Sequence, residues 1–501
     1  MSQKRETWSW RGAFVFAVIG SAVGLGNIWR FPYTAYSSGG GAFLIPYFVA
    51  LLTAGIPLMI MEFSLGHKFR QGAVTAFRSL GKKFEWAGWW ATLVAFVIIT
   101  YYGVIMAWAI RFVFSSLTLA WGSDPEGYFF GQVLHLTDSP GILGGIQWPL
   151  FFAYLAGWLA MYYIVKSGVK GVGKVVMITM PLPVILLIIM IIRGVTLPGA
   201  MEGLNFFLKP EWSQLLNPDV WLSAYGQIFY SLSVAMAILI AYASYLPEDA
   251  EITNNAFLAS FSNCAISFLA GFAVFSTLGY MAAQSGVAVS EVATAGVGLA
   301  FVVFPQAINL LPGAPLFGVL FFLLIISAGI DSAFSLVEGV VTSVADRWNL
   351  SRNTAVAVVT LPAFLIGVLY VTGAGLYWLD IVDHFINAFS LTVMGLIECI
   401  VVGWIYGADK IRKYANERSE ILLGKWYDFC IKYLTPAILI TIIGMSLYKE
   451  LQGPYGGYPL WSLLVGGWLL VISIPIVSYL LGRRGKAEAE SVPANTEEVQ
   501  A

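Results

Sequence analysis

An apolar stretch near the start of the chain, long enough to cross a membrane, is broken in its middle by three glycines and an asparagine. The stretch runs from Phe14 to Trp29, and the break reads Gly20-Ser21-Ala22-Val23-Gly24-Leu25-Gly26-Asn27. Each glycine disfavours a continuous helix by about 1 kcal/mol relative to alanine. Inside a bilayer, backbone groups that leave a helix must line a cavity or find partners within the protein. The break is therefore a candidate binding site, although small residues also simply let helices pack closely.

A second apolar segment, five spans later, carries polar side chains in its middle. It reads Gln227-Ile228-Phe229-Tyr230-Ser231-Leu232-Ser233-Val234-Ala235-Met236-Ala237. Interrupted spans at matching positions of two halves are the known pattern of transporters built from inverted repeats, whose site lies between the repeats. The amino ends of half-helices suit a carboxylate, and freed carbonyl groups suit a cation. Two matched breaks favour a binding site over simple close packing.

A carboxylate, Asp331, lies inside another apolar segment. A charged side chain at that depth is costly and usually marks a functional site. We expect Asp331 to be an ion ligand, and the alternative is a structural ion pair.

The composition is that of an integral membrane protein. Hydrophobic residues make up 58% of the 501 residues, charged residues 11%, and the mean hydropathy is +0.78. No basic block suggests nucleic acid binding. The cysteines (Cys264, Cys399 and Cys430) lie in or beside apolar segments, which argues against a disulfide framework or a zinc cluster. An enzyme is the least favoured class, because the three histidines are scattered and no arrangement around a nucleophile is evident.

These positions must be held by membrane helices, and apolar runs of span length predict twelve of them in an all-α fold. We place them at 11–36, 41–66, 88–118, 147–166, 173–194, 218–245, 256–284, 314–345, 353–372, 377–406, 425–448 and 459–482. We expect the segment 288–313, which is rich in Gly and Pro, to be an extracellular hairpin that caps an entrance.

The charges between these spans predict the orientation. Lysines and arginines, such as Lys4 and Arg5, Lys82 and Lys83, and Lys410 and Arg412, concentrate in alternate loops. Because such loops stay in the cytoplasm, we expect both termini on the cytoplasmic side of the cell (inner) membrane. The tail from Ala487 to Ala501 has the composition of a disordered segment.

The chain resembles the neurotransmitter:sodium symporter family along most of its length. The resemblance rests on Gly24-Leu25-Gly26-Asn27-Ile28-Trp29-Arg30-Phe31-Pro32, on Gly39-Gly40-Gly41-Ala42-Phe43, and on further landmarks at Glu62, Gln227 to Ser233, Ala241 to Tyr245 and Gly407 to Lys410. It implies a five-plus-five inverted repeat with broken first and sixth helices. The segments implied are a cytoplasmic segment 1–10, repeats at 11–195 and 218–406, two further helices at 424–482 and a cytoplasmic tail 483–501.

The resemblance implies two sodium sites. The first uses the Ala22 carbonyl, Asn27, Ser231, Asn263 and the substrate carboxylate. The second uses the Gly20 and Val23 carbonyls, Ala328, Asp331 and Ser332. Oxygen ligands of this kind suit a hard cation.

A chloride site is implied as well. Chloride-dependent members have a serine where chloride-independent bacterial amino-acid carriers have a glutamate, and this chain has Ser267. Asn263 and Ser267, like Gln227 and Ser231, are four residues apart and share a helix face. Together with Tyr47, these side chains are predicted to form a cage of uncharged hydrogen-bond donors. An anion in this cage would balance the charge of a buried sodium ion. The alternative is ordinary hydrogen bonding between helices.

The resemblance implies a pocket for a small-to-medium neutral amino acid. Its predicted lining is Ala22, Gly24, Gly26, Ile98, Tyr102, Phe229, Tyr230, Ser231, Ser233, Met236, Ser332 and Leu336. Gly24 leaves room for a carboxylate held by Tyr102, whereas monoamine carriers have an aspartate there. Ala235 and Ala237 depart from the glycines common in the family.

Gates are implied on both sides of the pocket. Arg30 and Asp383 form the outer pair, above an aromatic lid of Tyr102 and Phe229. Arg5 and Asp346 form the inner pair, supported by Trp8, Ser244 and Tyr245, although Arg5 could equally be a charge that sets topology. Glu62 and Glu338 are expected in internal polar networks.

The function implied is sodium-coupled, chloride-dependent symport by alternating access. We expect a monomer or weak oligomer in the lipid bilayer. The alternatives are a sodium-dependent amino-acid sensor without net flux and, less favoured, a channel, which would not need a carboxylate pocket beneath two gates.

Overall fold

The computed structural model describes residues 5–293 and 296–490, with side chains up to Arg483 at the C-terminal end. Lys4, the tail beyond Glu490 and part of the expected 288–313 hairpin lie outside the described residues. The described chain is helical, and in it β-structure is limited to one isolated antiparallel bridge between Ile146 and Thr372.

Among the described residues, ten continuous helices are long and apolar enough to cross a membrane, judged by length and composition. They span Gly40–Phe69, Lys82–Thr118, Trp148–Lys166, Gly168–Val195, Thr253–Ser285, Ala314–Trp348, Arg352–Val371, Gly375–Asn416, Lys425–Gly457 and Leu460–Arg483. Ten of the predicted spans therefore correspond to long helices.

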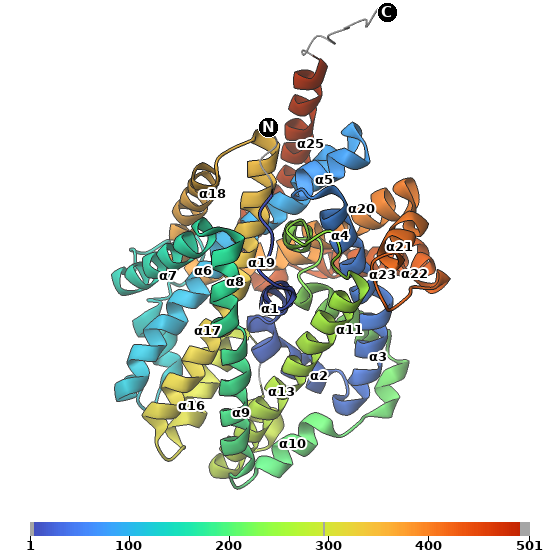
Figure 1. Cartoon of the computed structure of the whole chain (residues 1–501). Coiled ribbons are helices and arrows are strands. Elements are labelled where there is room, and N and C mark those ends of the chain that lie inside the picture. Colours follow the sequence, from blue (N-terminus) through green and yellow to red (C-terminus); the bar gives the residue numbers. More distant parts are fainter. Residues whose placement is uncertain (1–4, 294–295, 491–501) are drawn as a thin grey trace, which may run out of the picture.

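Several of these helices consist of consecutive α-helical pieces (Figure 1). The α-helical pieces are α3 (Leu44–Ala50), α4 (Ile56–Phe69), α6 (Glu85–Thr118), α7 (Trp148–Lys166), α8 (Gly168–Thr179), α9 (Pro181–Val195), α13 (Thr253–Ser285), α17 (Ala314–Trp348), α18 (Arg352–Gly367), α19 (Gly375–Phe385), α20 (Thr392–Glu398), α21 (Ala408–Asn416), α22 (Lys425–Phe429), α23 (Thr435–Gln452), α24 (Leu460–Leu463) and α25 (Leu469–Glu490). The shorter helices are α5 (Ala73–Leu80), α10 (Ala200–Leu208), α14 (Val289–Val292), α15 (Gly296–Gly298) and α16 (Phe304–Asn309).

The first predicted span is broken, as expected. Helix α1 (Arg11–Ala22) ends where Val23 adopts an extended conformation. The chain resumes as a short π-helical turn, Gly26–Arg30, and continues as α2 (Phe31–Ser37), which has a proline in its first turn. The two halves meet at 52°. Counted as one bent span, they bring the number of candidate crossings to eleven.

The sixth predicted span is also interrupted. Helix α11 (Pro218–Ser231) is capped by the Asn217 side chain, which accepts a hydrogen bond from the Asp219 N–H (3.0 Å). The chain then leaves the helix and resumes as α12 (Ile238–Ala243). Neither half alone is long enough to count as a crossing. Between them, Ser233, Ala235 and Ala237 have φ of 55°, 62° and 61°, which is the left-handed region that costs a residue with a Cβ about 1–2 kcal/mol.

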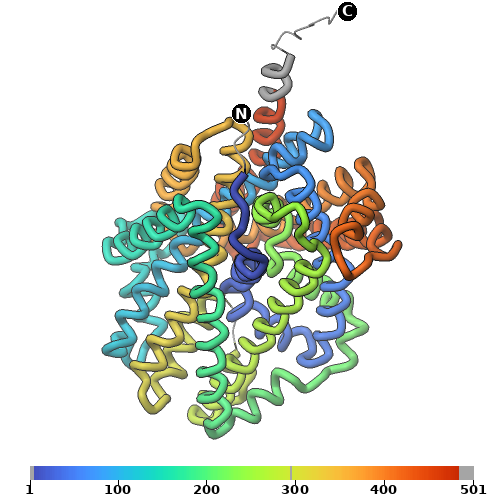
Figure 2. The backbone as a smooth tube through the Cα atoms, in the orientation of Figure 1, coloured from blue at the N-terminus to red at the C-terminus, as the bar shows by residue number. Residues whose placement is uncertain are grey.

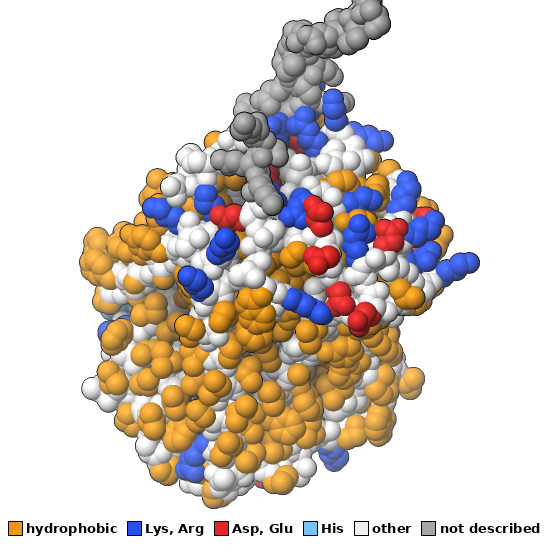
Figure 3. Space-filling view, viewed as in Figure 1, with side chains coloured by type: hydrophobic (Ala, Val, Ile, Leu, Met, Phe, Trp, Pro, Cys, Tyr) orange, Lys and Arg blue, Asp and Glu red, His pale blue; other side chains and the backbone are white. Residues whose placement is uncertain are grey.

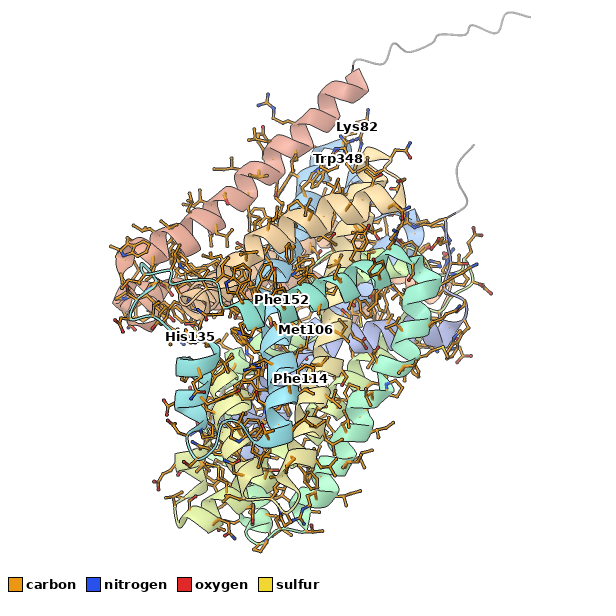
Figure 4. All side chains as sticks on the ribbon, turned by 90° about the vertical axis from the view of Figure 1, so that its left-hand side faces the viewer. Lys82, Met106, Phe114, His135, Phe152 and Trp348 are labelled. Carbon is orange, nitrogen blue, oxygen red and sulfur yellow. The ribbon has the colours of Figure 1, made fainter. Side chains whose placement is uncertain are left out.

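The two breaks lie side by side in the middle of the molecule (Figure 2). The Ser233 hydroxyl donates to the Ser21 carbonyl (3.1 Å), and the Ser332 hydroxyl on α17 donates to the same carbonyl (3.0 Å). Helix α1 packs against α8, α12, α13 and α17, and α17 packs along α6. Figure 4 shows α6 running through most of the molecule, from the region of Lys82, past Met106, to Phe114. Long buried helices thus hold both breaks in place.

Charge divides the molecule into two ends. Figure 3 shows lysine, arginine and acidic side chains gathered at the end where the termini lie, and mostly hydrophobic side chains over the rest of that face. We call this end the charged end. The other end, which carries α10 and α16 (Figure 1), is the opposite end.

The left-handed alanines give a test of the interrupted segment. Ala237→Gly removes the Cβ that strains the left-handed backbone, which should raise the free energy of unfolding by about 1–2 kcal/mol. The greater conformational freedom of glycine in the unfolded chain partly offsets this gain. Ala241, which is buried inside helix α12, is the matched control, because glycine in a helix costs about 1 kcal/mol. We expect the melting temperature of purified A237G to equal or slightly exceed the wild-type value and that of A241G to fall. An equal fall in both variants would contradict the left-handed conformation.

Candidate substrate and ion site

A cavity of about 50 Å³ lies between the two breaks. It is lined by every residue of the predicted pocket except Phe229, and also by Ser21, Leu25, Asn27 and Ile238. Sequence reasoning missed Ser21, Leu25 and Ile238 as lining residues, although all three lie in or beside the breaks. The cavity therefore takes its walls from α1, α6, α11, α12 and α17.

Gly24 keeps one side of this cavity open. A Cβ at Gly24 would lie 2.9 Å from the Ser332 Oγ and 3.2 Å from the Tyr102 hydroxyl oxygen. Any side chain there would collide with both hydroxyl groups or displace them. The space beside the Tyr102 hydroxyl is thus available to a ligand only because residue 24 is glycine.

The expected aromatic lid needs a correction. Phe229 lies outside the cavity lining, on the larger space above it, and its ring is packed against Gly395 of α20, where a Cβ would approach to 2.5 Å. Tyr230 lines the cavity instead, with the Arg30 guanidinium 5.0 Å from its ring centroid. Tyr230, and not Phe229, therefore lines the central cavity together with Tyr102. We call these two tyrosines the aromatic lid.

Four polar side chains of the first predicted sodium site and the anion cage converge beside the first break. The Asn27 Nδ2 donates to the Asn263 Oδ1 (2.8 Å) and the Ser267 Oγ (2.7 Å), with the Ser231 Oγ at 3.4 Å. The Asn27 Oδ1 accepts from the Gly24 N–H (2.9 Å). Three oxygens thus lie around the Asn27 amide nitrogen, and Ala22 lines the cavity next to this group. Oxygen atoms of amide and hydroxyl groups are ligands that suit a hard cation.

The second predicted sodium site contains a carboxylate that needs a cation. Asp331 is 1% exposed, and its Oδ1 has no hydrogen-bond partner among the described residues. It lies against Gly20, where a Cβ would come within 2.5 Å of its Oδ2. The Ser332 Oγ is 3.5 Å from the Gly20 carbonyl. Among the described residues Asp331 forms no ion pair, which argues against the structural alternative.

Ala328 and Val23 complete this neighbourhood. Ala328 is buried one turn before Asp331 on α17, and Val23 is extended, which frees its carbonyl from the helix. A buried carboxylate surrounded by freed carbonyls and a hydroxyl is chemically suited to a sodium ion.

The predicted anion cage contains unsatisfied donors. The Tyr47 hydroxyl and both polar atoms of the Gln227 amide are buried without hydrogen-bond partners among the described residues. The Asn263 Nδ2 donates to the Ser231 Oγ (2.9 Å), and Ser267 is fully buried. Because an unmade buried hydrogen bond costs about 1–3 kcal/mol, these groups fit an acceptor such as chloride.

At the opposite end the predicted outer pair is apart. Two cavities of about 590 and 450 Å³ share Trp29, Arg30, Tyr230 and Asp383 in their walls. The Asp383 Oδ1 accepts from the Tyr101 hydroxyl (2.7 Å) and the Asn387 Nδ2 (2.8 Å) instead of from Arg30. The smaller of the two cavities shares Leu25, Gly26, Tyr102 and Tyr230 with the central cavity, so only the aromatic lid separates them.

At the charged end the predicted inner pair is formed. The Arg5 Nη1 lies 3.0 and 2.8 Å from the two carboxylate oxygens of Asp346, and its Nη2 donates to the Ser244 Oγ (2.7 Å). The guanidinium also lies 4.7 Å from the Tyr245 ring centroid. Arg5 is thus the centre of a contact between the N-terminal segment, α12 and α17, and more than a charge that sets topology.

Trp8 adds a second layer to this closure. Its Nε1 donates to the Tyr242 carbonyl (2.9 Å), and its backbone N–H donates to the Tyr245 carbonyl (3.1 Å). The molecule is therefore closed between the central cavity and the charged end, and open from the lid to the opposite end.

The two expected polar networks differ. Glu338 pairs with Arg352 and accepts from the Tyr245 hydroxyl (2.9 Å) and the Thr342 hydroxyl (2.9 Å). Glu62 accepts from the Ala235 N–H (2.7 Å), in the interrupted segment. Neither lines the central cavity.

Comparison with known proteins identifies the family of this chain. The profile of the Sodium:neurotransmitter symporter family matches residues 5–125 and 121–484. An uncharacterised sodium-dependent transporter of Methanocaldococcus jannaschii is 43% identical over 480 residues, which cover 95% of this chain and 97% of that protein. The sodium- and chloride-dependent GABA transporter 2 is 35% identical over 513 residues in Mus musculus and in Homo sapiens, covering 94% of this chain and 85% of the relative.

The closed end gives a test based on Arg5. Arg5→Ala removes a partly buried ion pair in which the Arg5 Nη1 contacts both carboxylate oxygens of Asp346. We expect this pair to stabilise the closed end by about 1–2 kcal/mol. Amide hydrogen exchange at residues 8–15 should therefore be roughly tenfold faster than in the wild-type protein. Arg11→Ala is the matched control, because Arg11 pairs with Glu251 but is 55% exposed, and it should change exchange far less. Equal exchange in all three proteins would show that Arg5 does not hold this end closed.

Proposed function

The chain belongs to the sodium:neurotransmitter symporter family, and we propose that it is a sodium-coupled, chloride-dependent symporter of a small-to-medium neutral amino acid. One observation carries the proposal. A small cavity lies between two interrupted helices, with an unpartnered buried carboxylate on one side and unsatisfied buried donors nearby. Such a centre needs a cation and an anion to complete it.

We propose that α11 and α12 form one further crossing, which would bring the total to twelve. The repeats would be 11–195 and 218–406, followed by two additional helices in 424–482. The charged end would face the cytoplasm and contain both termini, in a cell membrane, because lysines and arginines remain on the cytoplasmic side.

The proposed substrate is defined by the walls of the cavity. Its carboxylate would lie beside Gly24 and accept a hydrogen bond from the Tyr102 hydroxyl. Ile98, Met236 and Leu336 would surround its apolar part. With glycine at position 24, the cavity offers no carboxylate for an amine there, which disfavours a monoamine. The volume of about 50 Å³ supports a small substrate.

We propose that the first sodium ion binds the Ala22 carbonyl, Asn27, Ser231 and Asn263 together with the substrate carboxylate. The second would bind the Gly20, Val23 and Ala328 carbonyls with Asp331 and Ser332. Chloride would accept from Tyr47, Gln227, Ser231, Asn263 and Ser267. Its negative charge would balance the first sodium ion in a region of low dielectric constant.

Alternating access would then use the two gates in turn. From the state described here, ions and substrate enter past Arg30. Closure at the lid would bring the Arg30 guanidinium to the Asp383 carboxylate. The new ion pair would replace the hydrogen bonds that Asp383 accepts from Tyr101 and Asn387. The contact of Arg5 with Asp346 would break afterwards, and the ions and the substrate would leave at the charged end.

The free energy for uptake comes from sodium. Each sodium ion that enters gains about 2.3 kcal/mol per 100 mV and about 1.4 kcal/mol for each tenfold concentration difference. Two sodium ions, one chloride ion and a zwitterion carry one net positive charge inward, so an inside-negative voltage should accelerate uptake.

The test is uptake of radiolabelled amino acids, including GABA, into proteoliposomes. We expect accumulation under inward sodium and chloride gradients, and its loss when choline replaces sodium or gluconate replaces chloride. Binding without accumulation would identify a sensor, and uptake that ignored sodium would refute the proposal.

Two variants at one position test the anion. Ser267→Glu supplies the negative charge, so we expect uptake that no longer needs chloride. Ser267→Ala, the matched control, should still require chloride, at higher concentration. Chloride-dependent uptake by S267E would contradict the assigned anion site.

A further inference from the structure

Asp383, the carboxylate of the outer pair, is held by two uncharged donors. It lies on α19, and its Oδ1 accepts from the hydroxyl of Tyr101 on α6 (2.7 Å) and from the Nδ2 of Asn387, one turn further along the chain (2.8 Å). Hydrogen bonds to an ionised carboxylate are stronger than those between uncharged groups. These two bonds therefore stabilise Asp383 in its present position without a contribution from Arg30.

Both donors are themselves fixed by their surroundings. Tyr101 is 2% exposed, and its ring packs edge-on against the ring of Tyr370, with 6.2 Å between the centroids. The Asn387 Nδ2 also donates to the Asp383 backbone carbonyl (2.9 Å). Asn387 belongs to a π-helical turn, Ile386–Leu391, and such turns are frequent at functional sites. Sequence reasoning singled out neither Tyr101 nor Asn387.

Arg30, the other member of the outer pair, has no carboxylate partner in the part of the chain that the structure describes. Its guanidinium lies near the Tyr230 ring, and none of the ion pairs between described residues includes it. Arg30 and Asp383 line the same two cavities. Opposite charges on the walls of one cavity attract each other. The two uncharged donors therefore oppose an attraction that would bring the side chains of the outer pair together.

We propose that Tyr101 and Asn387 are positioning residues that hold the outer gate open by competing with Arg30 for the Asp383 carboxylate. The inference rests on the proposed part of the outer pair in alternating access, and it adds the residues that decide when this pair forms. Removal of either donor leaves Asp383 with capacity for a bond that Arg30 can fill. The population then shifts toward the closed gate.

This competition sets a threshold for closure. A ligand shifts an equilibrium between two states only by as much as it binds one state better than the other. Bound ions and substrate must therefore stabilise the closed lid by more than the loss of the two bonds to Asp383 costs. An empty carrier remains open toward the opposite end.

Reaction of an introduced cysteine measures how open the gate is. The three native cysteines are buried. Ile105→Cys places a thiol on the wall of the cavity above the lid, at a residue that does not line the central cavity. A charged methanethiosulfonate reagent, added to the purified protein in sodium-containing buffer without substrate, should modify this thiol while the gate is open.

Tyr101→Phe removes one hydroxyl group and keeps the ring. In the I105C protein we expect it to slow modification at least about threefold, because it removes a hydrogen bond to a charged group. Asn387→Ala should act in the same direction. Tyr370→Phe is the matched control, because the Tyr370 ring contacts Tyr101 but its hydroxyl forms no hydrogen bond with Asp383 among the described residues. It should leave the rate unchanged.

Removal of Arg30 separates competition from a merely structural role. Arg30→Ala abolishes the ion pair of the closed gate, so Y101F and N387A should no longer slow modification when they are added to R30A. Equal rates in Y101F, N387A and the parent I105C protein, or slowing that persists in the R30A background, would overturn the proposal. Because the measurement uses neither substrate nor uptake, its failure is distinct from failure of symport.

Discussion

A backbone group that leaves a helix inside a membrane must find another partner, because no water is available to it. Both interrupted spans obey this constraint. The Gly24 N–H is satisfied by the Asn27 side chain, the Ala235 N–H by Glu62, and the Ser21 carbonyl by the hydroxyls of Ser233 and Ser332. The Gly24–Asn27 bond lies within the first break, and the other bonds tie a break to a neighbouring helix or to the other break. The carbonyls and the Asp331 oxygen left over are those that we assign to sodium.

Buried charge imposes a second constraint on the same centre. Glu338 is balanced by Arg352. Asp331 has no counter-charge among the described residues, and the unsatisfied Tyr47 and Gln227 have no acceptor there. We account for these two cases by a sodium ion and a chloride ion, each of which would be held next to a different side of the interrupted helices. Closure at one end and opening at the other then depend on the segments that these ligands hold in place.

Much of this arrangement could be predicted from the sequence. The run from Gly20 to Asn27 breaks a helix by local propensity, and ten of the twelve predicted apolar runs correspond to long helices. Phe229 was expected in the lid, but Tyr230 lines the central cavity, because the Phe229 ring is packed against Gly395 outside it. No local pattern shows which of the two rings packs against α20. Which gate is closed also depends on tertiary contacts, such as the bonds of Tyr101 and Asn387 to Asp383, that no local pattern reveals.

The central claim is that side chains and freed backbone of the two breaks form two sodium sites. Equilibrium binding of radiolabelled sodium to the purified protein, without substrate gradients, tests it most directly. The account predicts saturable binding that is weakened at one site by Asp331→Ala and at the other by Asn263→Ala, while Thr441→Ala, at an exposed position of α23, leaves both unchanged. Saturable binding that is the same in D331A, N263A and the wild type, or no saturable binding at all, would contradict it.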